Sequence, residues 1–179
     1  TLTVNQPSVS FVRSAGRSVD GAAYTVTISP TAGDFLGGFV WSATTPTITD
    51  NLGSTYTRDC TITYVQGGGT RQLTVFHLLN APTGITGITS SSQPWSRTIV
   101  AEYSGMPTSG AVLDVCGTPN TQTTASTSWS SAATITTATD LVFGLADTGF
   151  TAAAVYKASG AWTGRLEQPD PVDVDDSYL

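Results

Sequence analysis

Residues 22–29 read AAYTVTIS, and the spacing of their apolar side chains sets the structural class that we expect for the chain. Tyr24, Val26 and Ile28 alternate with small or hydroxyl-bearing residues. A period of two residues is typical of a strand with one buried and one solvated face. Pro30 ends the run, because proline cannot donate to a sheet ladder. The stretch therefore predicts a half-buried β-strand.

Strand signals continue on both sides of this stretch. Residues 35–41 (FLGGFVW) are almost wholly apolar, as expected of a central strand covered on both faces. Its glycine pair at 37–38 predicts a bulge or a close backbone approach. The three glycines at 67–69 predict a hairpin loop between strands at 55–65 and 72–79. Further strands are predicted at 8–12, 97–103, 111–115, 133–136, 140–145 and 152–156. Many short strands separated by turns predict an all-β fold, an antiparallel β-sandwich that is jelly-roll-like or immunoglobulin-like.

The composition agrees with this fold and excludes several partners. Only 11% of the residues are charged, and the formal net charge is -6. A nucleic-acid-binding protein needs a basic stripe, whereas the arginines here are scattered singly. The same charge disfavours anionic membrane surfaces, and no apolar run is long enough to span a bilayer. We therefore expect neither nucleic acid nor membrane insertion.

The chain divides into three parts by pattern. Residues 8–166 form the predicted sandwich domain, and residues 167–179 form an acidic, proline-containing C-terminal segment. Residues 1–7 are predicted to be an extended arm or a strand. The candidate assembly arm consists of the alternating residues Thr1, Leu2, Thr3 and Val4.

The two cysteines, Cys60 and Cys116, permit one intramolecular disulfide. A bridge needs their α-carbons to lie within about 7 Å of each other. Bridges of this kind are typical of extracellular proteins. At this point a disulfide and two unpaired thiols remain as alternatives.

Two residues are candidate catalytic groups. A Ser-His-Asp site would need His77, the only histidine, beside a nucleophile and an acid, but no Gly-x-Ser-x-Gly pattern occurs. We expect His77 to be a hydrogen-bonded strand residue. Glycoside hydrolysis needs two facing carboxyl groups, and Glu102 has no evident second one. Glu102 is instead expected to accept hydrogen bonds from a loop and to fix the turn at 103–105. The sequence therefore predicts no enzyme.

Calcium is the one metal for which the sequence offers ligands. Asp50 with Asn51, and Asp173 with Asp175, could supply oxygen atoms, although neither pair fits an EF-hand loop. Clustered His or Cys for a transition metal is missing from the sequence. We expect no cofactor, with calcium as the alternative.

Exposed tryptophans could bind carbohydrate. Trp95, Trp129 and Trp162 lie in or beside polar loops, where an aromatic face can stack on a sugar ring. The alternative for each is packing beneath a loop. Trp41 ends an apolar strand and is predicted to be in the core.

A series of short motifs resembles a recurrent bacterial and phage β-sandwich module of secreted, surface and tail-associated proteins. The motifs, in order over about residues 8 to 150, are GDFL at 33–36, TDNLGSTY at 49–56, IVAEYSG at 99–105, LD at 113–114 and TDLVFG at 139–144. The resemblance implies a non-catalytic accessory domain, in some cases a carbohydrate-binding one, with no defined active site.

The end of the chain departs from that pattern. Such modules usually continue with another apolar strand after the segment that matches 177–179, so the resemblance implies a sandwich that lacks one edge strand. An open edge invites pairing, and the arm at 1–4 could fill it in the same molecule or in a neighbour. We therefore expect an extracellular or surface-located structural or adhesive subunit of a surface filament, virion or tail, whose partners are copies of itself or other surface proteins. The alternative is a carbohydrate-binding module of a secreted polysaccharide-degrading enzyme.

Overall fold

The computed structural model describes most of the N-terminal two thirds of the chain and short parts of the remainder. The described residues are 8–66, 68–91, 93–113, 115–118, 141–144, 146–148, 163–169 and 176–178. They form strands and loops without any helix, so none of them belongs to a helix that could cross a membrane. The predicted arm at 1–7 and the predicted strands at 133–136 and 152–156 lie outside these residues.

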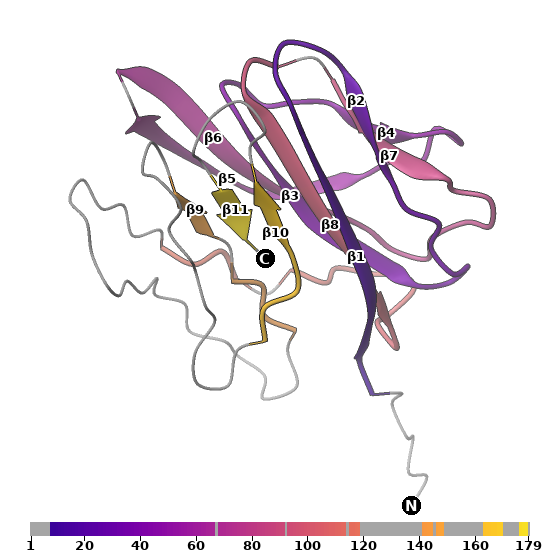
Figure 1. Ribbon diagram of the computed structural model, residues 1–179. Helices are drawn as coiled ribbons and strands as arrows, with labels where there is room; N and C mark the ends of the chain where they lie inside the picture. Colours follow the sequence, from indigo (N-terminus) through magenta and orange to yellow (C-terminus); the bar gives the residue numbers. More distant parts are fainter. Residues whose placement is uncertain are drawn as a thin grey trace, which may run out of the picture.

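Eight antiparallel strands form two packed sheets, which confirms the predicted β-sandwich (Figure 1). The larger sheet has the order β1 (Ser10–Val19), β8 (Ser96–Ser104), β3 (Phe35–Ser42), β6 (Gly69–Leu78) and β5 (Thr57–Gln66). The smaller sheet has the order β2 (Tyr24–Thr27), β7 (Gly87–Ser90) and β4 (Ile48–Asp50). Three further short strands form a separate sheet in the order β10 (Glu167–Pro169), β11 (Asp176–Tyr178) and β9 (Ala146–Thr148).

The core between the two packed sheets follows the alternation in the sequence. In β2, Tyr24 and Val26 are buried, and Ile28 just beyond the strand is buried as well, while Thr25 and Thr27 face solvent. Apolar side chains of the larger sheet meet them from the other side. The principal ones are Leu36, Val40, Phe76, Leu78 and Val100.

The larger sheet is also covered on its opposite face. All eight residues of β3 are buried, as expected of a strand with both faces covered. Loop residues that follow β8 pack on this second face. The described ones in contact with its apolar clusters are Met106, Val112, Leu141, Phe143 and Leu166.

The glycine pair in β3 marks a close approach and not a bulge. The pairing of β3 with β6 and with β8 runs without a register shift. A β-carbon on Gly37 would lie 2.5 Å from the ring of Phe35, and one on Gly38 would lie 2.3 Å from the carbonyl oxygen of Ile99. A larger residue at 38 would therefore push β3 and β8 apart, and one at 37 would displace the ring of Phe35.

Several strand boundaries differ from the predictions. The short strands β4 and β7 were not predicted, because their stretches resemble turns and polar loops. Conversely, the described residues of 111–115 and 140–145 are not in strands. Part of their apolar side chains still packs on the sheet from irregular backbone, since the partly buried Val112, Leu141 and Phe143 contact the cluster around Phe35. Leu113, Val115 and Val142 are exposed. The predicted glycine hairpin is confirmed, with Gln66 paired to Gly69.

Candidate functional site

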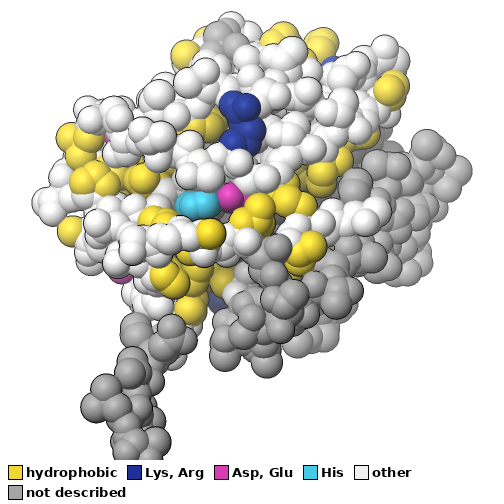
Figure 2. Space-filling model, turned by 180° about the vertical axis from the view of Figure 1, so that it is seen from behind, with side chains coloured by type: hydrophobic (Ala, Val, Ile, Leu, Met, Phe, Trp, Pro, Cys, Tyr) yellow, Lys and Arg dark blue, Asp and Glu magenta, His cyan; other side chains and the backbone are white. Residues whose placement is uncertain are grey.

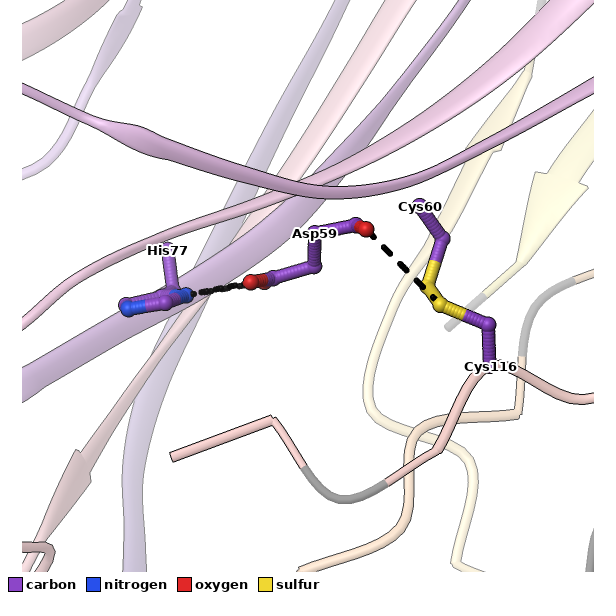
Figure 3. Close-up of polar contacts among 4 residues, drawn as sticks. All are labelled: Asp59, Cys60, His77 and Cys116. Atoms are coloured by element: carbon purple, nitrogen blue, oxygen red, sulfur yellow. Dashed lines mark hydrogen bonds and ion pairs between the residues drawn. A yellow bond between two sulfur atoms is a disulfide. The ribbon is translucent and has the colours of Figure 1, made fainter. Parts of the chain in front are cut away.

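The surface of the molecule carries one histidine next to an acidic side chain. On the face shown in Figure 2, the histidine lies between groups of hydrophobic side chains. The chain has a single histidine, His77 on β6. Its partner is Asp59 on β5, whose carboxylate oxygens lie 2.9 and 2.8 Å from Nδ1 of His77 (Figure 3). His77 is thus a hydrogen-bonded strand residue, as predicted, with a partner that the sequence pattern does not indicate.

A β-bulge brings Asp59 to this position. The register of β5 against β6 shifts between Arg58 and Cys60, so that Asp59 is the extra residue. Bulges often turn a side chain toward a functional site, because the extra residue leaves the normal alternation of the strand. Its neighbours Arg58 and Cys60 pair with the consecutive residues Phe76 and Val75 of β6, and Asp59 has no partner of its own in this ladder.

The imidazole of His77 is held in one orientation. The ring of Phe35 stacks on it, with ring centroids 5.7 Å apart and an angle of 17° between the planes. The side chains of His77 and Asp59 are only 9% and 10% exposed. Because the carboxylate can only accept, the Nδ1 atom carries the proton, and Nε2 of the neutral ring keeps its lone pair. Nε2 has no hydrogen-bond partner among the described residues, and in Figure 3 it points away from Asp59.

A disulfide fixes the loop that lies over this pair. Cys60 and Cys116 are bridged, with their α-carbons 6.1 Å apart. The sulfur of Cys116 lies 3.8 Å from the carbonyl oxygen of Asp59, so the bridge is in direct contact with the bulge (Figure 3). A cavity of about 240 Å³ lies between the loop and the strands. It is lined by Thr57, Arg58, Asp59, His77, Gly110, Ala111, Val112 and Leu113.

The pair can bind and orient a hydroxyl group, and the described residues around it supply no serine or cysteine nucleophile. Asp59 and His77 correspond in arrangement to the acid and base of such a triad. The residues that line the cavity include no serine and no free thiol. The site therefore offers an oriented hydrogen-bond acceptor, Nε2, beside an apolar wall.

Glu102 is fully buried and anchors a loop. Its Oε1 accepts a hydrogen bond of 2.8 Å from the amide of Thr31, and its Oε2 lies 2.8 Å from Nε of Arg13. The loop is thus the one before β3, and not the predicted turn at 103–105. Burial, and then the hydrogen bond and charge of Glu102, raise the pKa of Asp34. This second carboxyl group was missed in the sequence because only the fold brings the two together.

Asp50 and Asn51, the first candidate calcium pair, bind the backbone of neighbouring loops. The carboxylate of Asp50 accepts hydrogen bonds from the amides of Leu52 and Ser54 and from the hydroxyl of Tyr56. The side chain of Asn51 bridges the loop at 84–86. The described residues contain no group of three or more His, Cys, Asp or Glu side chains that could hold a metal. The second candidate pair, Asp173 and Asp175, lies outside them.

Trp95 is the candidate sugar-stacking residue that the structure describes. It is 42% exposed, and its backbone is left-handed with a φ of 47°. The amide of Trp95 donates to Asp20 over 2.8 Å, and the guanidinium of Arg71 lies 4.6 Å from its ring centroid. On its other side Arg71 approaches the buried Trp41 at 5.5 Å. Trp129 and Trp162 lie outside the described residues.

The described chain thus presents three features that could serve a function: the cavity beside His77, the exposed ring of Trp95, and the edges of the larger sheet. Comparisons with known protein families, with curated proteins and with solved structures found no match. We therefore infer function from the residues themselves.

Proposed function

We propose that the chain is a non-catalytic structural or adhesive subunit of an extracellular assembly, such as a surface filament, virion or tail, in which copies join by strand addition at β5. The observation that carries the proposal is the uncharged edge of β5. Among the described residues β5 pairs only with β6. Residues 60–66 (CTITYVQ) contain no charge, proline or glycine, and Val65 is 76% exposed. Edge strands that must stay unpaired usually carry charges, proline or bulges, and the bulge at Asp59 interrupts only the start of this one.

The opposite edge of the sheet supports this assignment by contrast. At the start of β1 the register shifts between Phe11 and Arg13, which is a bulge-type irregularity. Arg13 then donates to the carbonyl oxygen of Ser29, just beyond β2, over 3.0 Å. Arg17 donates to the carbonyl oxygen of Thr25 in β2 over 3.1 Å. Charges and an irregular register are the usual protection of an edge. The edge at β1 is therefore protected, whereas the described residues give no such protection to the distal part of β5.

The donor strand in this proposal is the arm of a neighbouring copy. Thr1, Leu2, Thr3 and Val4 alternate as an added strand requires, with backbone hydrogen bonds for affinity and side-chain pockets for specificity. The extracellular setting is supported by the Cys60–Cys116 bridge, because disulfides persist in oxidising compartments.

A charge placed on β5 tests the proposal. Thr63→Lys adds a cation to an exposed position of β5, and Thr27→Lys adds the same cation to an exposed position of the edge strand β2. We expect the parent and Thr27→Lys to form polymers in light scattering and electron microscopy. Thr63→Lys, and a chain that lacks residues 1–7, should stay monomeric with an unchanged melting temperature. A monomeric parent at all concentrations, or a Thr63→Lys chain that assembles normally, would refute strand addition at β5.

The exposed face of Trp95 favours one second candidate, a carbohydrate-binding module. A non-glycine residue in a left-handed conformation is strained, and such strain persists where the surroundings hold it. Here Asp20 and Arg71 hold it, which keeps the ring in a fixed orientation. A soluble polysaccharide should then change the tryptophan fluorescence of the parent but not of Trp95→Ala. Substitution of the exposed Leu52 by alanine provides the control that should behave like the parent.

A further inference from the structure

The imidazole of His77 is prepared to accept a hydrogen bond from something that the described chain does not supply. Asp59 holds the proton on Nδ1, and Phe35 fixes the ring plane. In the neutral form of the ring, Nε2 then has a lone pair of fixed direction. Nε2 is not fully buried, so a hydroxyl group bound in the cavity that His77 lines can donate to it in place of water.

The cavity limits the size and character of that partner. Its volume of about 240 Å³ is below the range of about 300–1,000 Å³ that is typical of sites for drug-sized ligands. One side of the cavity is polar, with Thr57 and the pair of Asp59 and His77. The other side is formed by the loop residues Val112 and Leu113. A molecule with hydroxyl groups on a compact carbon ring matches both sides.

Metal ions and anions fit this cavity less well. A stable transition-metal site needs about three or four protein ligands, and no such group occurs among the described residues. An anion would lie close to the carboxylate of Asp59, while the guanidinium of Arg58, which also lines the cavity, donates to the carbonyl oxygen of Pro46 over 3.4 Å. A neutral ligand avoids that repulsion, and a hydroxyl group supplies the donor that Nε2 requires.

We infer that the cavity beside His77 binds a neutral, hydroxyl-bearing molecule the size of one sugar ring, with a ligand hydroxyl donating to Nε2 of His77. The Cys60–Cys116 bridge takes part by fixing the loop that carries the apolar wall. This site is separate from the edge of β5 and from Trp95, so it goes beyond the proposed assembly and does not depend on it.

The single histidine makes a direct test available. In full-length protein labelled with ¹⁵N on histidine, the only two side-chain signals are Nδ1 and Nε2 of His77. The probes are D-glucose, D-galactose, D-mannose and N-acetyl-D-glucosamine, added in alkaline buffer so that the ring is neutral. We expect Nε2 to be the unprotonated nitrogen and its signal to shift saturably with at least one probe, with a Kd on the order of 1–10 mM.

Three variants control the result. Ala111→Phe fills the cavity from an exposed loop position and should abolish the shift without changing the melting temperature. Asp59→Asn removes the carboxylate that holds the proton on Nδ1, and should weaken binding by about tenfold. Trp95→Ala should bind like the parent, which separates this site from the tryptophan surface.

The inference is wrong if no probe moves the Nε2 signal at the highest soluble concentrations, or if Ala111→Phe responds like the parent. A response to sodium sulfate or zinc chloride in place of the sugars would also overturn it, because the site would then bind an anion or a metal.

Discussion

Removal of the Cys60–Cys116 bridge should be among the most destabilising changes that leave the core intact. The two cysteines are 56 residues apart, and closure of a loop of that length stabilises a folded chain by about 4 kcal/mol in the chain-entropy account. For a chain of 179 residues each kcal/mol corresponds to about 2–4 °C, so the double variant Cys60→Ala, Cys116→Ala should melt about 8–16 °C lower.

The location of the bridge predicts a local effect as well. It joins the edge strand β5 to the loop whose Val112 packs on the cluster around Phe35. Without the bridge this loop loses its covalent attachment beside Asp59, so the proposed cavity should also lose its ligand. Opening of the loop would lower the stability further than loop entropy alone.

Thermal and urea unfolding followed by circular dichroism measure the effect, with and without dithiothreitol. Reductant should lower the stability of the parent to that of the double variant and should leave the double variant unchanged. If the double variant and the reduced parent both lost less than about 1 kcal/mol, the loop-entropy reasoning would be refuted for this chain.

The remaining predictions concern carboxylates that anchor loops, and each is measured by urea unfolding over a pH series. Arg13→Met leaves the buried Glu102 without its cation, and the free energy of unfolding should fall by about 2–3 kcal/mol at neutral pH, a modest loss because Arg13 is itself half exposed. Arg13→Lys should recover part of this loss. Equal stability of the parent and both variants would count against the ion pair. Burial and Glu102 raise the pKa of Asp34, so this carboxyl group favours folding below its unfolded pKa of about 3.9 and opposes it once ionised. Asp34→Asn should therefore stabilise the fold at neutral pH and lose this advantage in acid. The pKa of Asp50 is lowered, because hydrogen bonds within its turn outweigh the opposing effect of burial. Asp50 therefore stabilises the fold above pH about 4, and this stabilisation is lost as the pH falls through the lowered pKa. Asp50→Asn should destabilise at neutral pH and converge with the parent in acid; a constant difference would contradict this.

The sequence predicted those strands whose burial leaves a clear pattern of apolar side chains. β2 alternates, β3 is apolar on both faces, and β8 has an apolar centre at 99–101, so these patterns were enough to predict the class of fold. β7 was missed because two of its buried residues are Gly87 and Ser90, which have no apolar signal. Position 87 requires glycine because a β-carbon there would lie 2.8 Å from the carbonyl oxygen of Val26 on β2. Close packing between strands thus removed the pattern that would have revealed the strand.

The pairing of Asp59 with His77 could not be predicted, for a different reason. The hairpin between β5 and β6 was predicted, and with it the antiparallel approach of the two strands. In that hairpin the direct partner of His77 is Thr57. Asp59 reaches the ring only because the register shifts by one residue at the bulge, and nothing in the local sequence marks that shift. Site geometry that depends on an irregularity is therefore the part that sequence patterns miss.

The two faces of the larger sheet differ in which substitutions they can accept, and this difference indicates which face can carry a binding site. The face toward β2 and β7 packs on another sheet, where backbone groups are paired and side chains interdigitate. A polar side chain introduced there by substitution would be left without a hydrogen-bond partner. The other face is covered largely by irregular loops, which leave room for His77 and Arg71 among the apolar clusters. Substitutions on the first face should therefore act through stability alone. Substitutions on the second face, such as Ala111→Phe or Trp95→Ala, can change what the molecule binds while the fold remains, because loop positions are not constrained by strand pairing.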